Sequence, residues 1–105
     1  ALLEAKADPG VADEDGVTAL MVAADHGHAA RVGALLEGKA DPAVTCKDGV
    51  TALMMAAQEG HTATVAVLLE GKADPAPARE NGYTALIIAA EGGHHATVAA
   101  LLEAK

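Results

Sequence analysis

Small apolar residues recur along this chain at the spacing of short helices, in pairs of segments. From Ala19, apolar residues occupy positions i, i+1, i+4 and i+5, which form one face of a helix. From Val32 they occupy positions i, i+3 and i+4, which predicts a second helix. Thr18 can cap the first helix through its hydroxyl, Gly27 separates the two helices, and Gly38 ends the second. Each unit is therefore predicted to be a helix, a tight turn and a helix.

The pattern repeats along the chain with a fixed period. The stretch DGVTALMMAAQEGHTATVAVLLEGK, residues 48–72, is closely matched by segments that begin at Asp15 and Asn81. Thr51 lies 33 residues after Thr18, and the glycine, histidine and leucine positions keep the same period. Such a period is typical of stacked repeats. Helices of roughly 8–10 residues are not stable alone, so the apolar stripe of each repeat must pack against its neighbours.

The period also predicts the organisation of the chain as a single repeat domain, residues 1–105. Its expected parts are a partial repeat and connector (1–14), two full repeats (15–47 and 48–80) and a repeat lacking its connector (81–105). Residues 1–6 have the same sequence as residues 100–105, so the chain is expected to begin within the last turns of a second helix. Asp15-Gly16 and its two equivalents favour tight turns, which predicts three turns protruding along one edge.

The repeated motif G-x-T-A-L-x-x-A-A-x-x-G-H-x-x-x-V-x-x-L-L-E resembles the ankyrin repeat. The resemblance covers nearly the whole chain, and the motif occurs three times in register. It implies an all-α, ankyrin-type solenoid of stacked helix-turn-helix repeats with hairpin-like connectors.

The chain departs from the family pattern at the start of each first helix and, in two repeats, at the glycine after the second helix. Ala19 and its equivalents replace the proline that starts the first helix in the family, and the histidine of the T-P-L-H motif is missing. The glycine after the second helix comes one position early, at Gly38 and Gly71, and Lys39 and Lys72 take its usual place. The geometry of this turn and the packing of the loop after it are therefore expected to differ from the family's.

Composition and charge narrow the possible partners. The chain has no Phe, no Trp and a single Tyr, although 51% of its residues are hydrophobic. Small side chains suit helices packed closely in thin layers. A formal net charge of −8 argues against nucleic acid and against an acidic membrane surface, because both would repel the chain. No apolar run approaches the roughly 18 residues needed to span a bilayer.

The residues that could carry chemistry have simpler structural interpretations. The histidines of the three repeats, His28, His61 and His94, would stack about 8–10 Å apart, too far to share a metal ion, so we expect each to bond to loop backbone at a helix start. Residues 13–15 are acidic but lack the spaced ligands of a calcium loop. Cys46 has no adjacent base. We therefore expect no metal site, no cofactor and no enzymatic activity.

The resemblance implies a first function, a non-catalytic scaffold for protein–protein interaction. Ankyrin-like stacks bind proteins through their hairpin tips and the exposed side of their first helices. In this chain that surface, hereafter the tip surface, comprises Glu14, Asp15, Val17, Asp25, His26, Lys47, Asp48, Val50, Gln58, Glu59, Glu80, Asn81, Tyr83, Glu91 and Gly92. It is acidic, so a basic protein surface is the natural complement. Tyr83 could serve as an aromatic anchor for a partner, or could cover a neighbouring connector.

A second function is structural self-assembly. Solenoid ends normally carry polar capping repeats, whereas both ends of this chain keep the apolar residues of internal repeats. Copies could then stack head-to-tail into filaments or tubes. The residues expected to form these end faces are Leu2, Leu3, Val98, Leu101 and Leu102. The alternative is that the sequence is an excerpt of a longer array whose neighbouring repeats cover both ends.

Overall fold

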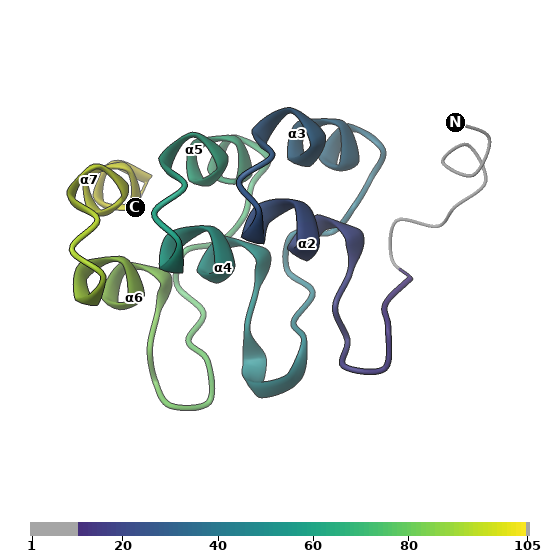
Figure 1. The fold of residues 1–105 in the computed structure, drawn as a ribbon, viewed down its shortest axis with the longest axis horizontal. Coiled ribbons are helices and arrows are strands. Elements are labelled where there is room, and N and C mark those ends of the chain that lie inside the picture. Colours follow the sequence, from purple (N-terminus) through teal and green to yellow (C-terminus); the bar gives the residue numbers. More distant parts are fainter. Residues whose placement is uncertain (1–10, 105) are drawn as a thin grey trace.

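The computed structural model describes residues 11–104, which form helices arranged in two layers (Figure 1). In chain order these are α2 (Ala19–Asp25), α3 (Ala29–Glu37), α4 (Ala52–Gln58), α5 (Thr62–Glu70), α6 (Ala85–Glu91) and α7 (His95–Ala104), with a short 3₁₀ turn η1 (Lys47–Gly49) in the second connector. The predicted partial repeat at residues 1–6 lies outside the described residues. Each of the three predicted repeats that follow contains one helix pair.

The first helix of each repeat packs beside the first helix of the next, and the second helices do the same. Thus α2, α4 and α6 form one layer, and α3, α5 and α7 form the other (Figure 1). The connectors extend from this stack as three loops on one side. The predicted all-α solenoid of helix-turn-helix repeats with hairpin-like connectors is confirmed.

The repeated threonine begins each first helix, as its position predicted. The Thr18 hydroxyl accepts a hydrogen bond of 3.3 Å from the backbone N–H of Met21. Thr51 and Thr84 make the same bond with the residue three positions later. Each bond pairs an amide that has no partner within its helix. The first helices therefore start normally without the family's proline.

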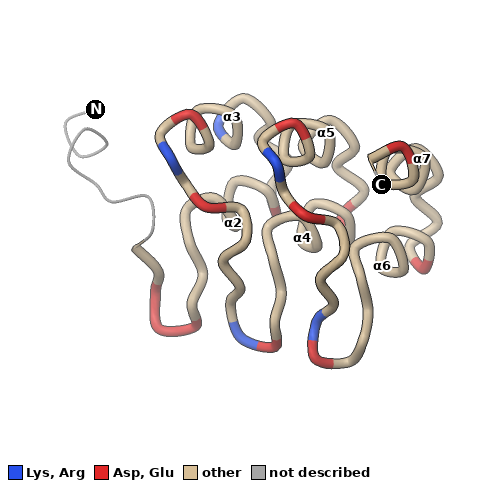
Figure 2. The backbone as a smooth tube through the Cα atoms, turned by 180° about the vertical axis from the view of Figure 1, so that it is seen from behind, with Lys and Arg blue, Asp and Glu red and all other residues tan. Residues whose placement is uncertain are grey.

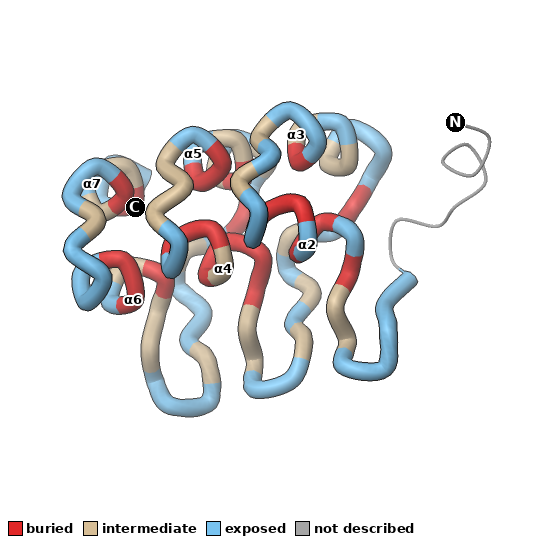
Figure 3. Tube along the Cα trace, viewed as in Figure 1, coloured by how far each residue is buried: buried red, intermediate tan, exposed pale blue. Residues whose placement is uncertain are grey.

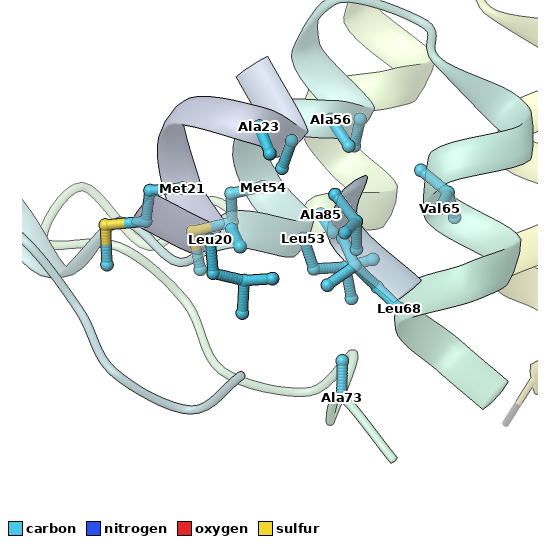
Figure 4. Close-up of a cluster of buried hydrophobic side chains, with 14 of the residues drawn as sticks. Leu20, Met21, Ala23, Leu53, Met54, Ala56, Val65, Leu68, Ala73 and Ala85 are labelled. Atoms are coloured by element: carbon cyan, nitrogen blue, oxygen red, sulfur yellow. The ribbon is translucent and has the colours of Figure 1, made fainter. Parts of the chain in front are cut away.

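The core consists of alanine together with leucine, valine, isoleucine and methionine side chains, and the alanines allow the two layers to lie close together. Alanines such as Ala24 are fully buried between helices and leave no room for larger groups. Figure 4 shows Leu20 and Met21 of α2 together with Leu53 and Met54 of α4. Buried positions recur on the facing sides of every helix pair, whereas the loop tips are exposed (Figure 3).

Consecutive residues of each first helix face opposite neighbours in the stack. Met21 and Met54 are buried, but Ile87, the equivalent residue of the last repeat, is 41% exposed. One position later the order reverses, since Val22 of the first repeat is 48% exposed and Ile88 of the last is buried. The first of these positions therefore packs on the following repeat, and the second packs on the preceding repeat.

The end-face prediction needs one correction. Leu101 is only 4% exposed and belongs to the core, whereas Leu102 is 51% exposed and Val98 is half-buried. Successive residues of a helix are rotated by about 100°, so only one of two adjacent leucines can point away from the stack. Leu2 and Leu3 lie outside the described residues.

The early glycine after the second helix has a packing reason in the middle repeat. A Cβ on Gly71 would stand 2.7 Å from Cδ1 of Leu36 in the preceding repeat. Gly71 itself has an ordinary φ of −83°, and Lys72 adopts the left-handed conformation with φ 76°. Lys39 does the same in the first repeat, with φ 79°. The left-handed conformation costs a residue other than glycine about 1–2 kcal/mol, so this turn is strained in both repeats.

A buried hydroxyl distinguishes the two interfaces between repeats. Thr97 is fully buried, and its Oγ1 lies 2.8 Å from Oγ1 of Thr62 in the preceding repeat. Thr64, its equivalent in the middle repeat, is equally buried, but its hydroxyl has no hydrogen-bond partner within the described part of the chain. Ala29 stands where Thr62 would supply that partner. An unpaired buried hydroxyl destabilises the first interface.

We therefore expect Thr64→Val to stabilise the protein. The substitution keeps the branched shape and removes the unpaired hydroxyl, so the free energy of unfolding should rise by about 1 kcal/mol. Thr97→Val is the matched control, because it breaks an existing bond and should lower that free energy by about 1 kcal/mol. Urea denaturation of both variants measures the difference. Equal effects of the two substitutions would show that the Thr64 hydroxyl is satisfied in solution.

Candidate protein-interaction surface

The predicted tip surface follows the connector tips and the ends of the first helices. Most of its residues are exposed, and only Val17, Val50 and Tyr83 are half-buried. These three occupy the same position in successive repeats, where they pack against the core. The structure therefore makes nearly all of the predicted surface available to solvent.

Short hydrogen bonds shape each tip. In the first connector, Oδ1 of Asp13 accepts hydrogen bonds from the backbone N–H groups of Asp15, at 2.8 Å, and Val17, at 3.0 Å. Gly16 between them has φ 82°, which glycine adopts without strain. The Asp13 carboxylate thus organises its own turn.

Successive tips are also joined to one another through the backbone. The N–H of Lys47 donates to the carbonyl of Asp15 at 3.0 Å, and the N–H of Glu80 donates to the carbonyl of Asp48 at 2.8 Å. The Lys47 ammonium also lies 3.6 Å from an Asp15 carboxylate oxygen, in an exposed ion pair worth about 0–1 kcal/mol. The backbone bonds keep the three tips in one row, so the tip surface is continuous rather than three separate loops.

Charge is unevenly distributed over this row. Seven of the fifteen tip-surface residues are Asp or Glu, and one is Lys. Figure 2 shows only acidic residues at the first tip, whereas the second and third tips also carry a basic residue. These are Lys47 and Arg79. The acidic character is therefore strongest at the first tip.

Tyr83, the only tyrosine, is held within its own repeat. Its hydroxyl donates a 2.8 Å hydrogen bond to Oε2 of Glu91 at the end of α6. That hydrogen bond, together with the negative charge of Glu91, raises the pKa of Tyr83. The ring therefore ties the third connector to α6, a contact that sequence spacing did not indicate. Tyr83 is partly buried against the core and partly exposed at the tip surface.

Two of the three histidines bond to backbone, as predicted, but the acceptors are carbonyls at the ends of helices in the preceding repeat rather than loop carbonyls. Nε2 of His61 lies 3.1 Å from the carbonyl oxygen of Asp25, and Nε2 of His94 lies 3.0 Å from that of Gln58. Each ring occupies the space above a glycine of the preceding repeat. Asp25 and Gln58 belong to the tip surface, so these histidines also fix the helix ends that display it. The ring of His28 instead stacks on that of His26, with centroids 5.8 Å apart.

The described residues form neither a metal site nor an activated nucleophile. In that part of the chain, no three His, Cys, Asp or Glu side chains gather where they could hold a metal ion. Cys46 is half-buried and packs against the core, and its thiol donates to the carbonyl of Lys47 at 3.6 Å. None of the described helices has the length and apolar character needed to cross a membrane.

Comparison with known proteins agrees with this geometry. A family model described as ankyrin repeats, in three copies, matches residues 1–78 and 30–105. The two matches together span the whole chain. No curated protein matches it.

The fit of each histidine ring over a glycine can be measured with a matched pair of variants. Gly60 and Gly93 have nearly the same left-handed backbone, but a Cβ on Gly60 would stand 2.5 Å from the ring of His94, and a Cβ on Gly93 would meet nothing within 4 Å. Both alanine variants should lose about 1–2 kcal/mol from backbone strain, and Gly60→Ala should lose about 1–3 kcal/mol more from overpacking. Equal midpoints in urea would refute the close packing of the ring.

The Tyr83–Glu91 bond can be tested by titration, because no other tyrosine or tryptophan contributes to the absorbance. Glu91→Gln removes the negative charge and should return the Tyr83 pKa toward the ordinary value of a tyrosine. The matched variant Glu59→Gln should leave the pKa unchanged. Folding raises the pKa of Tyr83. The bond therefore stabilises the fold at pH values below the ordinary pKa of tyrosine, and this contribution is lost as the pH rises through the raised pKa. A titration curve unaffected by Glu91→Gln would contradict the assigned contact.

Proposed function

The chain belongs to the ankyrin repeat family, whose repeats generally mediate protein–protein interaction, and we propose that it is a non-catalytic scaffold that binds a protein partner through its tip surface. The observation that carries this proposal is the continuity of that surface. Its residues are mostly exposed, and backbone hydrogen bonds between successive tips hold them in one row. Such a row can follow an extended or irregular partner segment over three repeats.

The partner we propose is a basic protein surface. Seven carboxylates and one ammonium group leave the tip surface acidic, and the excess is largest at the first tip. Complementary charge accelerates association and selects among partners more than it adds affinity. Interface hot spots are rich in Trp, Tyr and Arg, and this surface offers only Tyr83, half-buried and bonded to Glu91. We therefore infer a salt-sensitive interaction of moderate strength.

A non-catalytic role fits the chemistry available in the described residues. Ankyrin repeat proteins are generally non-catalytic scaffolds. The carboxylates of the tip surface are exposed to solvent. The nearby Asp13 carboxylate accepts hydrogen bonds from two backbone N–H groups of its own turn. No cofactor is required for the proposed binding.

A second candidate function, head-to-tail self-assembly, is favoured by a separate observation. Three of the large apolar side chains that remain exposed lie at the two ends of the described stack: Val22 at the first repeat, and Ile87 and Leu102 at the last. Internal equivalents of these positions pack on a neighbouring repeat. The same faces would be covered by further repeats if the array were longer.

The tip-surface proposal predicts the outcome of a selection from a random peptide display library. Peptides captured by the chain should be enriched in Lys and Arg, and a selected peptide should bind more weakly as salt rises. The double variant Glu59→Gln, Glu80→Gln removes two tip-surface charges and should raise the dissociation constant about 2- to 30-fold. Calorimetry or fluorescence anisotropy provides the measurement.

The matched control removes two charges elsewhere. Glu37 and Glu70 are exposed at the ends of α3 and α5, outside the tip surface. Glu37→Gln, Glu70→Gln should therefore leave the affinity nearly unchanged. Equal losses in the two double variants, or selected peptides without basic residues, would refute the proposed surface.

A further inference from the structure

The contacts between successive repeats occur twice in the described chain, always in the same register. A histidine ring packs over the glycine of the preceding repeat and bonds to the carbonyl at the end of that repeat's first helix, and a tip N–H donates to the tip carbonyl before it. A leucine of the second helix also packs on the next repeat, as Leu36 does on Gly71. Together these contacts describe what one repeat requires of the next.

At the α6–α7 end, the glycines and carbonyls that contact the next repeat in the earlier copies have no such contact among the described residues. The first two tip glycines would place a Cβ against the next connector, at 3.1 Å from Cα of Cys46 and 3.4 Å from Cα of Arg79, whereas a Cβ on Gly82 would meet nothing within 4 Å. A Cβ on Gly93 would also meet nothing within 4 Å, whereas a Cβ on Gly27 or Gly60 would meet a histidine ring of the next repeat. No histidine of the described residues reaches the Glu91 carbonyl.

The first described repeat carries the residues that contact a preceding repeat in the later copies. His28 is exposed, and its ring lies against His26 rather than over a glycine. Val22 occupies the position that packs on a preceding repeat in later copies of the motif. Among the described residues, a Cβ on Gly38 would meet only two carbonyl oxygens, both at 3.5 Å, whereas one on Gly71 would meet Leu36. Within that part of the chain, no leucine packs on Gly38 as Leu36 packs on Gly71.

We propose that these two ends bind one another, so that the first repeat of a second copy docks on the α6–α7 end in the register of the internal interfaces. This proposal rests on the second candidate function and names its contacts. In that register, His28 of the second copy lies over Gly93 and donates to the carbonyl of Glu91. The backbone N–H of Glu14 of the second copy donates to the carbonyl of Asn81.

The apolar part of the joint follows from the same register. Leu102 packs on Gly38 of the second copy, as Leu36 packs on Gly71 within the chain. Ile87 faces the first helix of the second copy, which presents Val22. These residues supply the exposed apolar area that the joint removes from water.

At two positions the proposed joint differs from the internal interfaces between repeats. Arg31 of the second copy takes the place of Thr97, and His95 takes the place of Thr62. A neutral imidazole nitrogen can accept a hydrogen bond from a guanidinium, so this pair replaces the hydroxyl pair. The incoming copy engages through its first tip and its first helix pair. The contact is heterologous and grows into an open chain.

The test uses two variants of the full chain, each blocked at one end. Val22→Glu blocks the first-repeat end, and Leu102→Glu blocks the last-repeat end; both residues are about half exposed, so both variants should fold, as circular dichroism would verify. Each variant alone should remain at 10.4 kDa in sedimentation velocity, whereas the unaltered chain should gain mass as its concentration rises. An equimolar mixture of the two variants should form a dimer and stop there, because one intact end of each kind remains.

Two further variants probe the specificity of the joint. Ala63→Glu adds a carboxylate at a position exposed in all three repeats, and it should associate like the unaltered chain. His28→Ala should weaken association about 3- to 10-fold, the effect of one net hydrogen bond.

The proposal is overturned if the unaltered chain stays monomeric at all concentrations, if either blocked variant still associates alone, or if the mixture yields no dimer. Binding of a selected basic peptide, measured on the same samples, reports separately on the tip surface. Loss of one activity with retention of the other tells the two proposals apart.

Discussion

The close approach of neighbouring repeats is the constraint on which the rest of the structure depends. No helix pair of this chain can bury its apolar face alone, so each pair must pack against at least one neighbouring pair. Alanine and glycine at the contact positions bring the layers near enough for a histidine ring to reach the backbone of the previous repeat. The same approach allows the tips to bond to each other, and so creates the continuous tip surface.

The regular part of this architecture was predictable from the sequence because most repeated residues act locally. The threonine caps, the two helices per repeat and the protruding tips follow from local chemistry at a fixed spacing. That His61 and His94 bond to backbone was also expected, but that the bonded carbonyls belong to the preceding repeat was not. Which of two adjacent apolar residues faces the core was harder to interpret. The burial of Leu101 and the exposure of Leu102 depend on the rotation of the helix, which turns by about 100° per residue.

Other features depend on pairs that the repeat pattern hides. Lys72 takes the left-handed position because Gly71 is needed beneath Leu36, a contact between repeats. Thr64 lacks a partner because Ala29 replaces a hydroxyl in another repeat. The tip surface itself was placed by resemblance. Its exposure agrees with that placement, but affinity depends on a partner whose shape the chain does not encode.

The backbone bonds made by the histidines join residues only 36 positions apart, and the main helix contacts link adjacent repeats. A chain connected in this way has a low contact order, which favours fast folding. During synthesis, each repeat can complete its packing as soon as the next one emerges from the ribosome, without waiting for a distant segment. The order of assembly is thus the order of translation, and a stalled or truncated chain would still retain folded repeats behind its growing end.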